Sequence, residues 1–291
     1  MGVLDRLVLP SPAKINLFLH ITGRRPDGYH EIQTIFQILE FADSLSFELI
    51  KGTDEIVVEC PGLDLVESEN LVYQAARMLQ QLASPGKGAR IFVEKLIATG
   101  AGLGGGSSNA ATALLGLNYL WQSGLSTEHL AKIGRQLGAD VPVFIHGETA
   151  WGEGIGEKLT PIELPPQSYL ILNPGCHVAT AEIFSHPDLT RDSSKSKIAR
   201  FLEQVASFDL ARNDCEAVVS TLYPEVSEAI LWLSKWGAAR MTGTGSCIFL
   251  SIPTLEKGRE ILSQVPAKWS AFITRGTQTS ALIEELNQIS Q

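Results

Sequence analysis

The 291-residue sequence lacks an excess of basic residues, with 23 Lys and Arg against 32 Asp and Glu and a formal net charge of −9. A charge of this sign opposes binding to the phosphate backbone of nucleic acids, so we expect no nucleic-acid partner. Charged residues make up only 19% of the chain and hydrophobic residues 44%. This balance excludes a disordered tail, a collagen-like repeat and a coiled-coil rod, and it predicts a globular protein.

Cysteines and long apolar runs are also scarce. Cys60, Cys176, Cys215 and Cys247 lie far apart and form no C-x-x-C pair, which indicates neither a zinc site nor a disulfide framework. The N-terminal segment meets Pro10 before any long apolar run, so it is typical of neither a signal peptide nor a transit peptide. No stretch approaches the ~20 apolar residues that a bilayer span needs. We expect a cytoplasmic protein, or a protein of the plastid stroma if the source is a photosynthetic eukaryote.

The hydrophobic pattern predicts a fold of the α+β class, because β–α units alternate too seldom for a doubly wound parallel sheet. The length suits one large domain or two ordinary ones. A cluster of prolines after residue 160 places a boundary near 163, which gives domains 1–163 and 164–291. In the first domain, strands are expected at 13–22, 32–40, 44–50, 54–59 and 89–94, and helices at 69–82, 107–121 and 127–137. In the second, we expect a strand at 168–173, a polar loop at 190–197 and helices near 198–206 and 214–234, then strand, strand, helix, strand and helix.

The most informative segment is the glycine-rich run T-G-A-G-L-G-G-G-S-S-N-A-A-T-A at 99–113. Five of the seven residues from Gly100 to Gly106 are glycines, and these lack the Cβ atoms that would keep a ligand away from the backbone. N-cap residue types and a good helix-forming stretch follow, so the loop is expected to lead into a helix N-terminus. Free N–H groups and the positive end of the helix dipole make an anion site, and a triphosphate is its usual occupant.

The loop alone leaves several interpretations open. Gly100, Gly102 and Gly105 match the dinucleotide fingerprint G-x-G-x-x-G, but Glu128 is the only candidate for the acidic residue expected about 20 positions on. Glu128 lies in a segment that is typical of a helix start. A P-loop would need lysine where Ser107 stands. A flexible linker or a close helix-packing surface is the structural alternative.

Three segments together resemble the GHMP kinases, the small-molecule kinases named for galactose, homoserine, mevalonate and phosphomevalonate. They are P-A-K-I-N at 12–16, G-L-G-G-G-S-S-N-A-A at 102–111 and M-T-G-T-G-S-C at 241–247, in the order of the family's motifs. Within the family, three further segments resemble the branch that phosphorylates a cytidine diphosphate polyol. These are G-R-R-P-D-G-Y-H at 23–30, G-A-D-V-P-V-F-I-H-G at 138–147 and R-N-D-C-E at 212–216.

The resemblance implies an ATP- and Mg²⁺-dependent kinase with its active site in a cleft between two domains. The N-terminal domain would be ribosomal-protein-S5-domain-2-like and the C-terminal domain ferredoxin-like. The implied reaction phosphorylates the 2-hydroxyl of 4-diphosphocytidyl-2-C-methyl-D-erythritol, in the non-mevalonate route to isoprenoid precursors. The alternatives are another GHMP kinase, an inactive nucleotide-binding module and a nicotinamide dehydrogenase. We expect a monomer or a weak homodimer.

The resemblance assigns the chemistry to Lys14 and Asp140. Phosphoryl transfer needs positioning, charge stabilisation and a base that receives the proton of the attacking hydroxyl. Asp140 matches the family's catalytic aspartate, although its spacing alone favours an N-cap of the next segment. Lys14 matches the active-site lysine, whose cation would favour the ionised carboxylate and lower the pKa of the substrate hydroxyl. The strand pattern alone favours a solvent-facing lysine.

The resemblance also implies a pocket for the pyrimidine. Tyr29 and His30 follow the turn dipeptide Asp27-Gly28, and stacking on an aromatic ring contributes about 1–3 kcal/mol per base. Phe184 matches a second aromatic that sandwiches the cytosine. Without the resemblance, Tyr29 would be a semi-buried turn residue and Phe184 a core residue. Further substrate contacts are expected from Asn16, Thr180, Gly243 and Gly245.

The same resemblance gives the expected ATP contacts. Ser107 and Ser108 would contact the phosphates, and each is a candidate Mg²⁺ ligand because no carboxylate can be assigned to the metal. Ala98 and Thr99 depart from the family's usual residues, proline and a bulkier side chain, which predicts a looser start of the loop. The full set expected to bind ATP is Asn70, Lys95, Ala98, Thr99, Gly100, Ala101, Gly102, Leu103, Gly104, Gly105, Gly106, Ser107 and Ser108.

Overall fold

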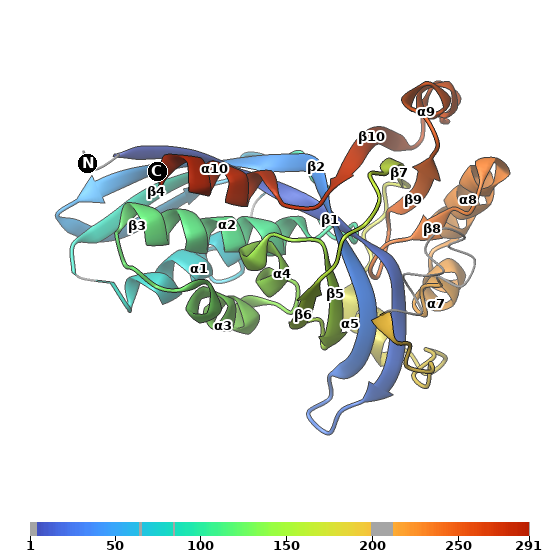
Figure 1. Cartoon of the computed structure of the whole chain (residues 1–291), viewed down its shortest axis with the longest axis horizontal. Coiled ribbons are helices and arrows are strands. Elements are labelled where there is room, and N and C mark those ends of the chain that lie inside the picture. The colour runs from blue at the N-terminus through green and yellow to red at the C-terminus, as the bar shows by residue number, and fades with distance from the viewer. Residues whose placement is uncertain (1–4, 64–65, 84, 199–211, 291) are drawn as a thin grey trace.

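A long two-stranded ribbon connects the two halves of the molecule (Figure 1). The computed structural model describes residues 5–63, 66–83, 85–198 and 212–290. The ribbon consists of β1 (Arg6–Arg24) and β2 (His30–Lys51), which pair antiparallel. The pattern predicts two strands where β2 runs unbroken. Asp43 lies between the two expected ranges and is buried within β2, because backbone N–H groups outside β2 bind its carboxylate.

The first half of the chain adds strands along the edge of β2 that faces away from β1. Toward the C-terminal end of β2, β4 (Lys87–Glu94) pairs antiparallel with it, and β3 (Thr53–Glu59) pairs parallel with β4. Toward the N-terminal end of β2, β5 (Ala150–Gly154) pairs with it, and β6 (Lys158–Pro161) pairs with β5. The pattern did not predict β5 and β6, because glycines and turn residues crowd that stretch. The helices on this sheet are α1 (Leu71–Gln80), α2 (Gly105–Leu120), α3 (Thr127–Leu137) and α4 (Val141–His146).

The first hydrophobic core lies between this sheet and its helices. Helix α2 is surrounded on most sides, and Ala110, Leu114 and Leu117 along it are inaccessible to solvent. At Gly116 a Cβ atom would lie 3.0 Å from the ring of Phe47, so the helix packs closely on β2. This packing fixes α2, and with it the glycine-rich loop at its N-terminus. The predicted helices at 69–82, 107–121 and 127–137 are confirmed as α1, α2 and α3.

The second half builds a smaller antiparallel sheet in the order β10-β7-β9-β8. Its strands are β7 (Ser168–Asn173), β8 (Arg240–Met241), β9 (Ile248–Ile252) and β10 (Ser270–Thr277). Around it lie α5 (Thr180–Ser185), α7 (Glu216–Leu222), α8 (Pro224–Leu233), the 3₁₀ turn Ser234–Trp236 and α9 (Leu255–Leu262).

The helix expected over 214–234 is two helices in the structure. Pro224 has no N–H to continue the first helix, and Tyr223 before it has φ −125° and ψ 87°, outside the helical region. The helix expected near 198–206 lies almost wholly outside the described residues. Among the helices of the described part of the chain, none is long and apolar enough to cross a membrane.

The last elements of the chain return to the first core. At the end of β10, Gly276 and Thr277 pair with β2 and so join the two sheets. Helix α10 (Ala281–Ile289) then packs along β1 (Figure 1), and its Leu282 is buried in the first core. The boundary near residue 163 stays a prediction, and the end of the chain crosses it.

The ring nitrogens of His20, on β1, are buried. Both ring nitrogens are inaccessible and have no hydrogen-bond partner among the described residues, and the ring meets Phe18 edge-on at a centroid distance of 4.9 Å. Burial lowers the pKa of His20, and the nearby Asp214 carboxylate partly opposes this effect. The folded protein therefore takes up the proton of His20 less readily than the unfolded chain does.

This environment predicts a loss of stability in acid. Because the pKa of His20 is lower in the folded state, the unfolding free energy should fall as the pH drops below about 6.5, the ordinary pKa of histidine. His20→Phe removes this group, so urea unfolding of the variant between pH 7.5 and 5 should show a shallower decline than the wild type. Equal declines in the two proteins would contradict the prediction.

Candidate active site

The glycine-rich run forms a loop that leads directly into α2, as predicted. Gly100, Gly102 and Gly104 have φ values of 63°, 78° and 74°, a backbone region that favours glycine. Gly104 is the N-cap of α2, and no side chain caps the helix there. The first N–H groups of α2 therefore remain available for an anion, at the positive end of the helix dipole.

The loop is held on both sides by main-chain hydrogen bonds. The carbonyl of Leu103 accepts a bond from β1, and the carbonyl of Ala101 accepts one from the N–H of Cys247, each at 3.0 Å. At Gly102 a Cβ atom would lie 2.2 Å from the carbonyl oxygen of Thr242. Gly102 thus allows the close packing that the structural alternative proposed. The loop as a whole is hydrogen-bonded to β1 on one side and to the third motif on the other.

A cavity of about 390 Å³ lies over this loop. Its lining comes from β1, the loop, the start of α4, helix α5 and the turn after β8, so both halves of the chain contribute. Most of the predicted site residues meet here although they are far apart in the sequence. Those that line the cavity are Lys14, Asn16, Ala98, Thr99, Gly100, Ala101, Gly102, Gly104, Gly105, Gly106, Ser107, Asp140, Thr180, Phe184, Gly243 and Gly245.

Lys14 and Asp140 form an ion pair in this cavity. The Nζ atom of Lys14 lies 3.2 Å from Oδ2 of Asp140. Only 3% of the Lys14 side chain is exposed, so the solvent-facing alternative is wrong. Nζ also donates to Oδ1 of Asn16 at 2.6 Å and to the carbonyl oxygen of Gly102 at 3.1 Å. Three oxygen acceptors therefore satisfy the buried ammonium group and fix its position.

Asp140 occupies the N-cap position of α4, but its side chain makes no capping hydrogen bond. The residue has φ −86° and ψ −9°, and proline in the first turn of α4 starts the helix without needing an N–H partner. The carboxylate instead pairs with Lys14, and the Asp140 side chain, which lines the cavity, is 32% exposed. The capping role that its spacing favoured is therefore absent at this side chain.

Asn16 and Phe36 support Lys14 from β1 and β2. The backbone N–H of Asn16 donates to Oγ1 of Thr242, and its Nδ2 donates to Oγ1 of Thr34, both at 2.8 Å. The Asn16 amide thus orients Lys14 through its remaining oxygen. Nζ of Lys14 lies 5.7 Å from the centroid of the Phe36 ring, a cation–π distance. The predicted contact of Asn16 with the substrate stays a prediction.

The turn after β8, which carries the third motif, is held in place by Asn213. Its Nδ2 donates to the carbonyl oxygens of Met241 at 3.0 Å and Gly243 at 2.7 Å, and its Oδ1 accepts from the N–H of Cys215. Asn213 is buried. The R-N-D-C-E segment at 212–216 therefore positions one wall of the cavity.

Replacing Asn213 by alanine should lower the free energy of unfolding by about 1–3 kcal/mol, because two carbonyls lose their donor and cannot easily reach water. Urea denaturation measures this effect. Asn173→Ala is the matched control, since that side chain accepts a hydrogen bond from the exposed N–H of Gly175. A loss no larger for Asn213→Ala than for the control would show that the clamp does not stabilise the turn.

Four residues expected to bind ATP lie outside the cavity lining, and Ser108, Leu103 and Asn70 are three of them. Ser108 is buried and its hydroxyl lies 2.9 Å from that of Ser11. Leu103 is buried in the hydrophobic core. Asn70 caps α1, where its Oδ1 accepts from the first backbone N–H groups. Contacts of these three residues with ATP stay predictions.

Lys95, the fourth such residue, neutralises a buried carboxylate beside the N-terminus of α2. Asp43 is buried; its Oδ1 accepts from the N–H groups of Leu96 at 2.7 Å and Ile97 at 2.8 Å, and its Oδ2 binds Lys95 and Nδ2 of Asn109. The Lys95 side chain is only 13% exposed. This structural role was missed from the sequence, and a contact with adenosine stays a prediction.

The residues expected at the pyrimidine lie at the end of the β1–β2 ribbon and on α5. Tyr29 is 58% exposed, whereas His30 is buried against Phe184, with ring centroids 5.1 Å apart and a tilt of 34°. Because these two rings already touch, a base would stack on the pair instead of entering between its members. Thr180 lies within 2.9 Å of Thr244, hydroxyl to hydroxyl.

Several cavity residues were missed from the sequence. Thr244 lies between the two glycines of the third motif, and this position next to predicted site residues is the sequence signal that indicates it. Leu19, Ile32 and Phe36 also line the cavity. Their apolar pattern on the strands is the same as that of core residues, so no sequence signal separates them.

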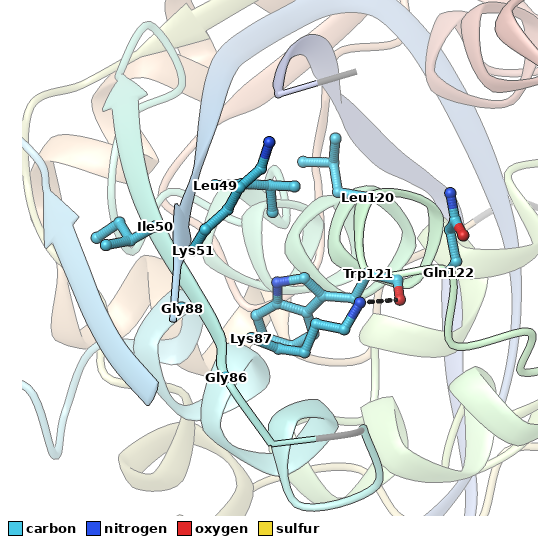
Figure 2. A pocket seen from close by; sticks show the side chains of 9 residues that line it. All are labelled: Leu49, Ile50, Lys51, Gly86, Lys87, Gly88, Leu120, Trp121 and Gln122. Atoms are coloured by element: carbon cyan, nitrogen blue, oxygen red, sulfur yellow. Dashed lines mark hydrogen bonds between the residues drawn. The ribbon is translucent and has the colours of Figure 1, made fainter. Parts of the chain in front are cut away.

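A second cavity, of about 260 Å³, lies at the opposite end of α2 (Figure 2). It is lined by residues of β2, β4 and the end of α2, and Nζ of Lys87 donates to the carbonyl oxygen of Trp121 at 3.0 Å. None of the predicted site residues lines it. The cavity over the glycine loop is therefore the candidate active site. Over the residues that the structure covers, no group of three or more His, Cys, Asp or Glu is arranged to hold a metal ion.

Comparison with known proteins identifies the family. The models of the GHMP kinases N-terminal and C-terminal domains match residues 70–148 and 196–271. The chain is 48% identical to the 4-diphosphocytidyl-2-C-methyl-D-erythritol kinase of Hahella chejuensis, over 98% of both chains. It is 50% identical to the same kinase of Alkalilimnicola ehrlichii, over 95% of this chain and 93% of the relative. The chain belongs to the GHMP kinases, in the 4-diphosphocytidyl-2-C-methyl-D-erythritol kinase family.

Solved structures agree with this family. The crystal structure of a 4-(cytidine 5'-diphospho)-2C-methyl-D-erythritol kinase matches with a TM-score of 0.80 and 32% identity, over 93% of this chain and all of that one. A mevalonate kinase with 17% identity and a TM-score of 0.66, covering 93% of this chain and 99% of that one, shares the fold. The expected α+β GHMP kinase fold is thus confirmed. The protein is a kinase of this family, and ATP is its phosphate donor.

Proposed function

We propose that this kinase transfers the γ-phosphoryl group of ATP to the 2-hydroxyl of 4-diphosphocytidyl-2-C-methyl-D-erythritol, giving the 2-phosphate and ADP. The Lys14–Asp140 pair, 3.2 Å apart in a cavity that also exposes the glycine loop, carries the proposal. An acid–base pair and an anion site are the two parts that phosphoryl transfer to an alcohol needs. Relatives of nearly half-identical sequence are named for this substrate.

Asp140 is the group that we assign to the acceptor hydroxyl. Lys14 contacts Oδ2, so the hydroxyl proton is received at Oδ1 as the oxygen forms its bond to the γ-phosphorus. The bond between that phosphorus and the β,γ-bridging oxygen breaks, and ADP leaves. The buried ammonium of Lys14 holds the carboxylate in place and offsets the negative charge that gathers where the hydroxyl reacts.

The start of α2 is assigned to the phosphates of ATP. The N–H groups that follow Gly104 have no side-chain cap and belong to the positive end of the helix. Mg²⁺ would be held mainly by phosphate oxygens together with the hydroxyl of Ser107, which lines the cavity, and it would neutralise phosphate charge. Ser108 fits this role poorly, because its buried hydroxyl is bonded to Ser11.

The cytidine end of the substrate is assigned to Tyr29, His30 and Phe184, and its middle portion to Thr180, Gly243 and Gly245. The contact between His30 and Phe184, and the place of Phe184 and Thr180 in the cavity lining, support this orientation. We further propose that the reaction takes place in the cytoplasm, where ATP is supplied, and that the chain acts as a monomer or a weak homodimer.

A coupled assay of ADP release tests the substrate. Purified kinase is given ATP, Mg²⁺ and one acceptor at a time: the cytidine diphosphate polyol, mevalonate or homoserine. Turnover is expected with the first acceptor alone. Preference for mevalonate or homoserine would assign the chain to another GHMP activity. ATP binding without turnover of the cytidine substrate would mean an inactive nucleotide-binding module.

A further inference from the structure

Arg191 lies in the polar segment T-R-D-S-S-K-S-K at 190–197, to which the proposed function gives no role. Its guanidinium joins the loop after α5 to the end of the β1–β2 ribbon. Nε donates to Nε2 of His30 at 3.1 Å. The other two nitrogens donate to four carbonyl oxygens, that of Phe184 in α5 at 3.1 Å and, in the loop, those of His186 at 2.7 Å, Pro187 at 3.4 Å and Leu189 at 3.0 Å.

The bond to His30 determines which ring nitrogen carries the proton. Arginine has five N–H donors, no acceptor, and stays protonated in proteins. Nε2 of His30 must therefore accept, and a neutral imidazole that accepts at Nε2 carries its proton on Nδ1. No residue of the described chain is bonded to Nδ1. His30 thus offers an unused Nδ1–H donor.

The surroundings also keep His30 neutral. Burial lowers the pKa of His30, and the cations of Arg191, from the loop, and Arg24, from β1, lower it further. A proton on Nε2 would in addition point at the guanidinium of Arg191 and break the bond between them. The single-donor form of His30 is therefore favoured at neutral pH.

We propose that Arg191 is a positioning residue that sets base preference by fixing His30 as an Nδ1–H donor beside Phe184. This inference rests on the proposed function. A fixed donor that faces N3 of the base favours cytosine, whose N3 is an acceptor, over uracil, whose N3 carries a proton. The O2 atom accepts in both bases and does not distinguish them. A histidine free to change tautomer would serve either base. Arg191 thereby favours a cytidine diphosphate substrate over its uridine counterpart.

The tautomer can be measured without any turnover. In protein labelled with ¹⁵N-histidine, NMR distinguishes protonated from bare ring nitrogens, and His30→Asn identifies the His30 signals. At pH 7.5 the wild type should show a protonated Nδ1 and a bare Nε2. Arg191→Met should give a mixture of the two tautomers. A wild-type His30 with its proton on Nε2, or an unchanged pattern in Arg191→Met, would overturn the inference.

Kinetics test the consequence for base preference. Arg191→Met should raise KM for the cytidine substrate about tenfold. It should lower the cytidine-to-uridine ratio of kcat/KM by a similar factor, because about one hydrogen bond to the base is lost. The kcat value should change little, because Lys14 and Asp140 are untouched. Lys195→Met removes an exposed cation from the same segment and is the control that should change neither quantity. An unchanged ratio in Arg191→Met would refute the role.

Arg191 also binds the carbonyl of Phe184, so a purely structural role must be separated from control of the tautomer. In a His30→Asn background there is no tautomer to fix, and Arg191→Met should then have a much smaller effect on the base ratio. An equal effect in both backgrounds would indicate loop support alone. If Arg191→Met does not fold, Arg191→Lys keeps the charge but loses the planar set of donors, and it should show the same changes to a lesser degree.

The outcomes separate this inference from the proposed function. A wild type that does not phosphorylate the cytidine substrate refutes the proposed function, while the NMR result still reports the His30 tautomer. A wild type that phosphorylates it but has the opposite tautomer refutes the role of Arg191 alone.

Discussion

Asp140→Asn should lower kcat by roughly 10²- to 10⁴-fold, the usual contribution of a general base. Asparagine has the shape of aspartate but cannot accept the proton of the acceptor hydroxyl. The glycine loop and the start of α2, to which the proposed function assigns the phosphates, are separate from this side chain, so ATP affinity should stay close to that of the wild type. ADP-release kinetics give kcat, and calorimetric titration with a non-hydrolysable ATP analogue gives the affinity.

Asp192→Asn is the control for lost charge, because Asp192 is exposed and lies outside the cavity lining. It should retain wild-type turnover. If Asp140→Asn also kept its turnover within a few-fold of the wild type, Asp140 would not be the base. A loss of ATP binding in Asp140→Asn would instead assign Asp140 to the nucleotide or its metal.

Lys95→Met should lower the free energy of unfolding by about 3–5 kcal/mol, the usual cost of leaving a buried charge without its partner. The Asp43 side chain is fully buried. Its remaining donors, two backbone N–H groups and the amide of Asn109, are neutral and cannot replace the positive charge of the ammonium group. Because Asp43 also binds the N–H groups of Leu96 and Ile97, the stretch that leads to the glycine loop should loosen as well. Urea denaturation measures the loss.

Two variants make this result specific. Asp43→Asn combined with Lys95→Met removes both charges and should recover part of the loss. Lys132→Met, at an exposed lysine, should stay within about 0.5 kcal/mol of the wild type. If Lys95→Met were as stable as the wild type but bound ATP weakly, Lys95 would act as the adenosine contact that the family resemblance implies.

Local sequence patterns predicted the parts of the fold that local interactions determine. The glycine loop and the helices α2 and α3 follow from short-range backbone and capping preferences. The continuity of β2 did not follow, because Asp43 needs partners some fifty residues away. The break before Pro224 was a local signal that the helical periodicity concealed.

The candidate site depended more on the family resemblance than on residue patterns. Spacing alone made Lys14 a surface residue and Asp140 a cap, and only the folded chain places their side chains 3.2 Å apart. Lys95 has no pattern that indicates Asp43 as its partner. Arg191 stood out as part of a polar segment, but its bond to His30 joins positions 161 residues apart, which no single-sequence pattern can predict.

The return of α10 to the first core has a consequence for dividing the chain. A fragment that stops near residue 163 lacks Leu282 and the rest of the helix that covers β1, so it would present an apolar groove to solvent. The complementary fragment would carry that helix with nothing to pack on. The two pieces should therefore require co-expression and behave as a fragment-complementation pair, each solubilising the other.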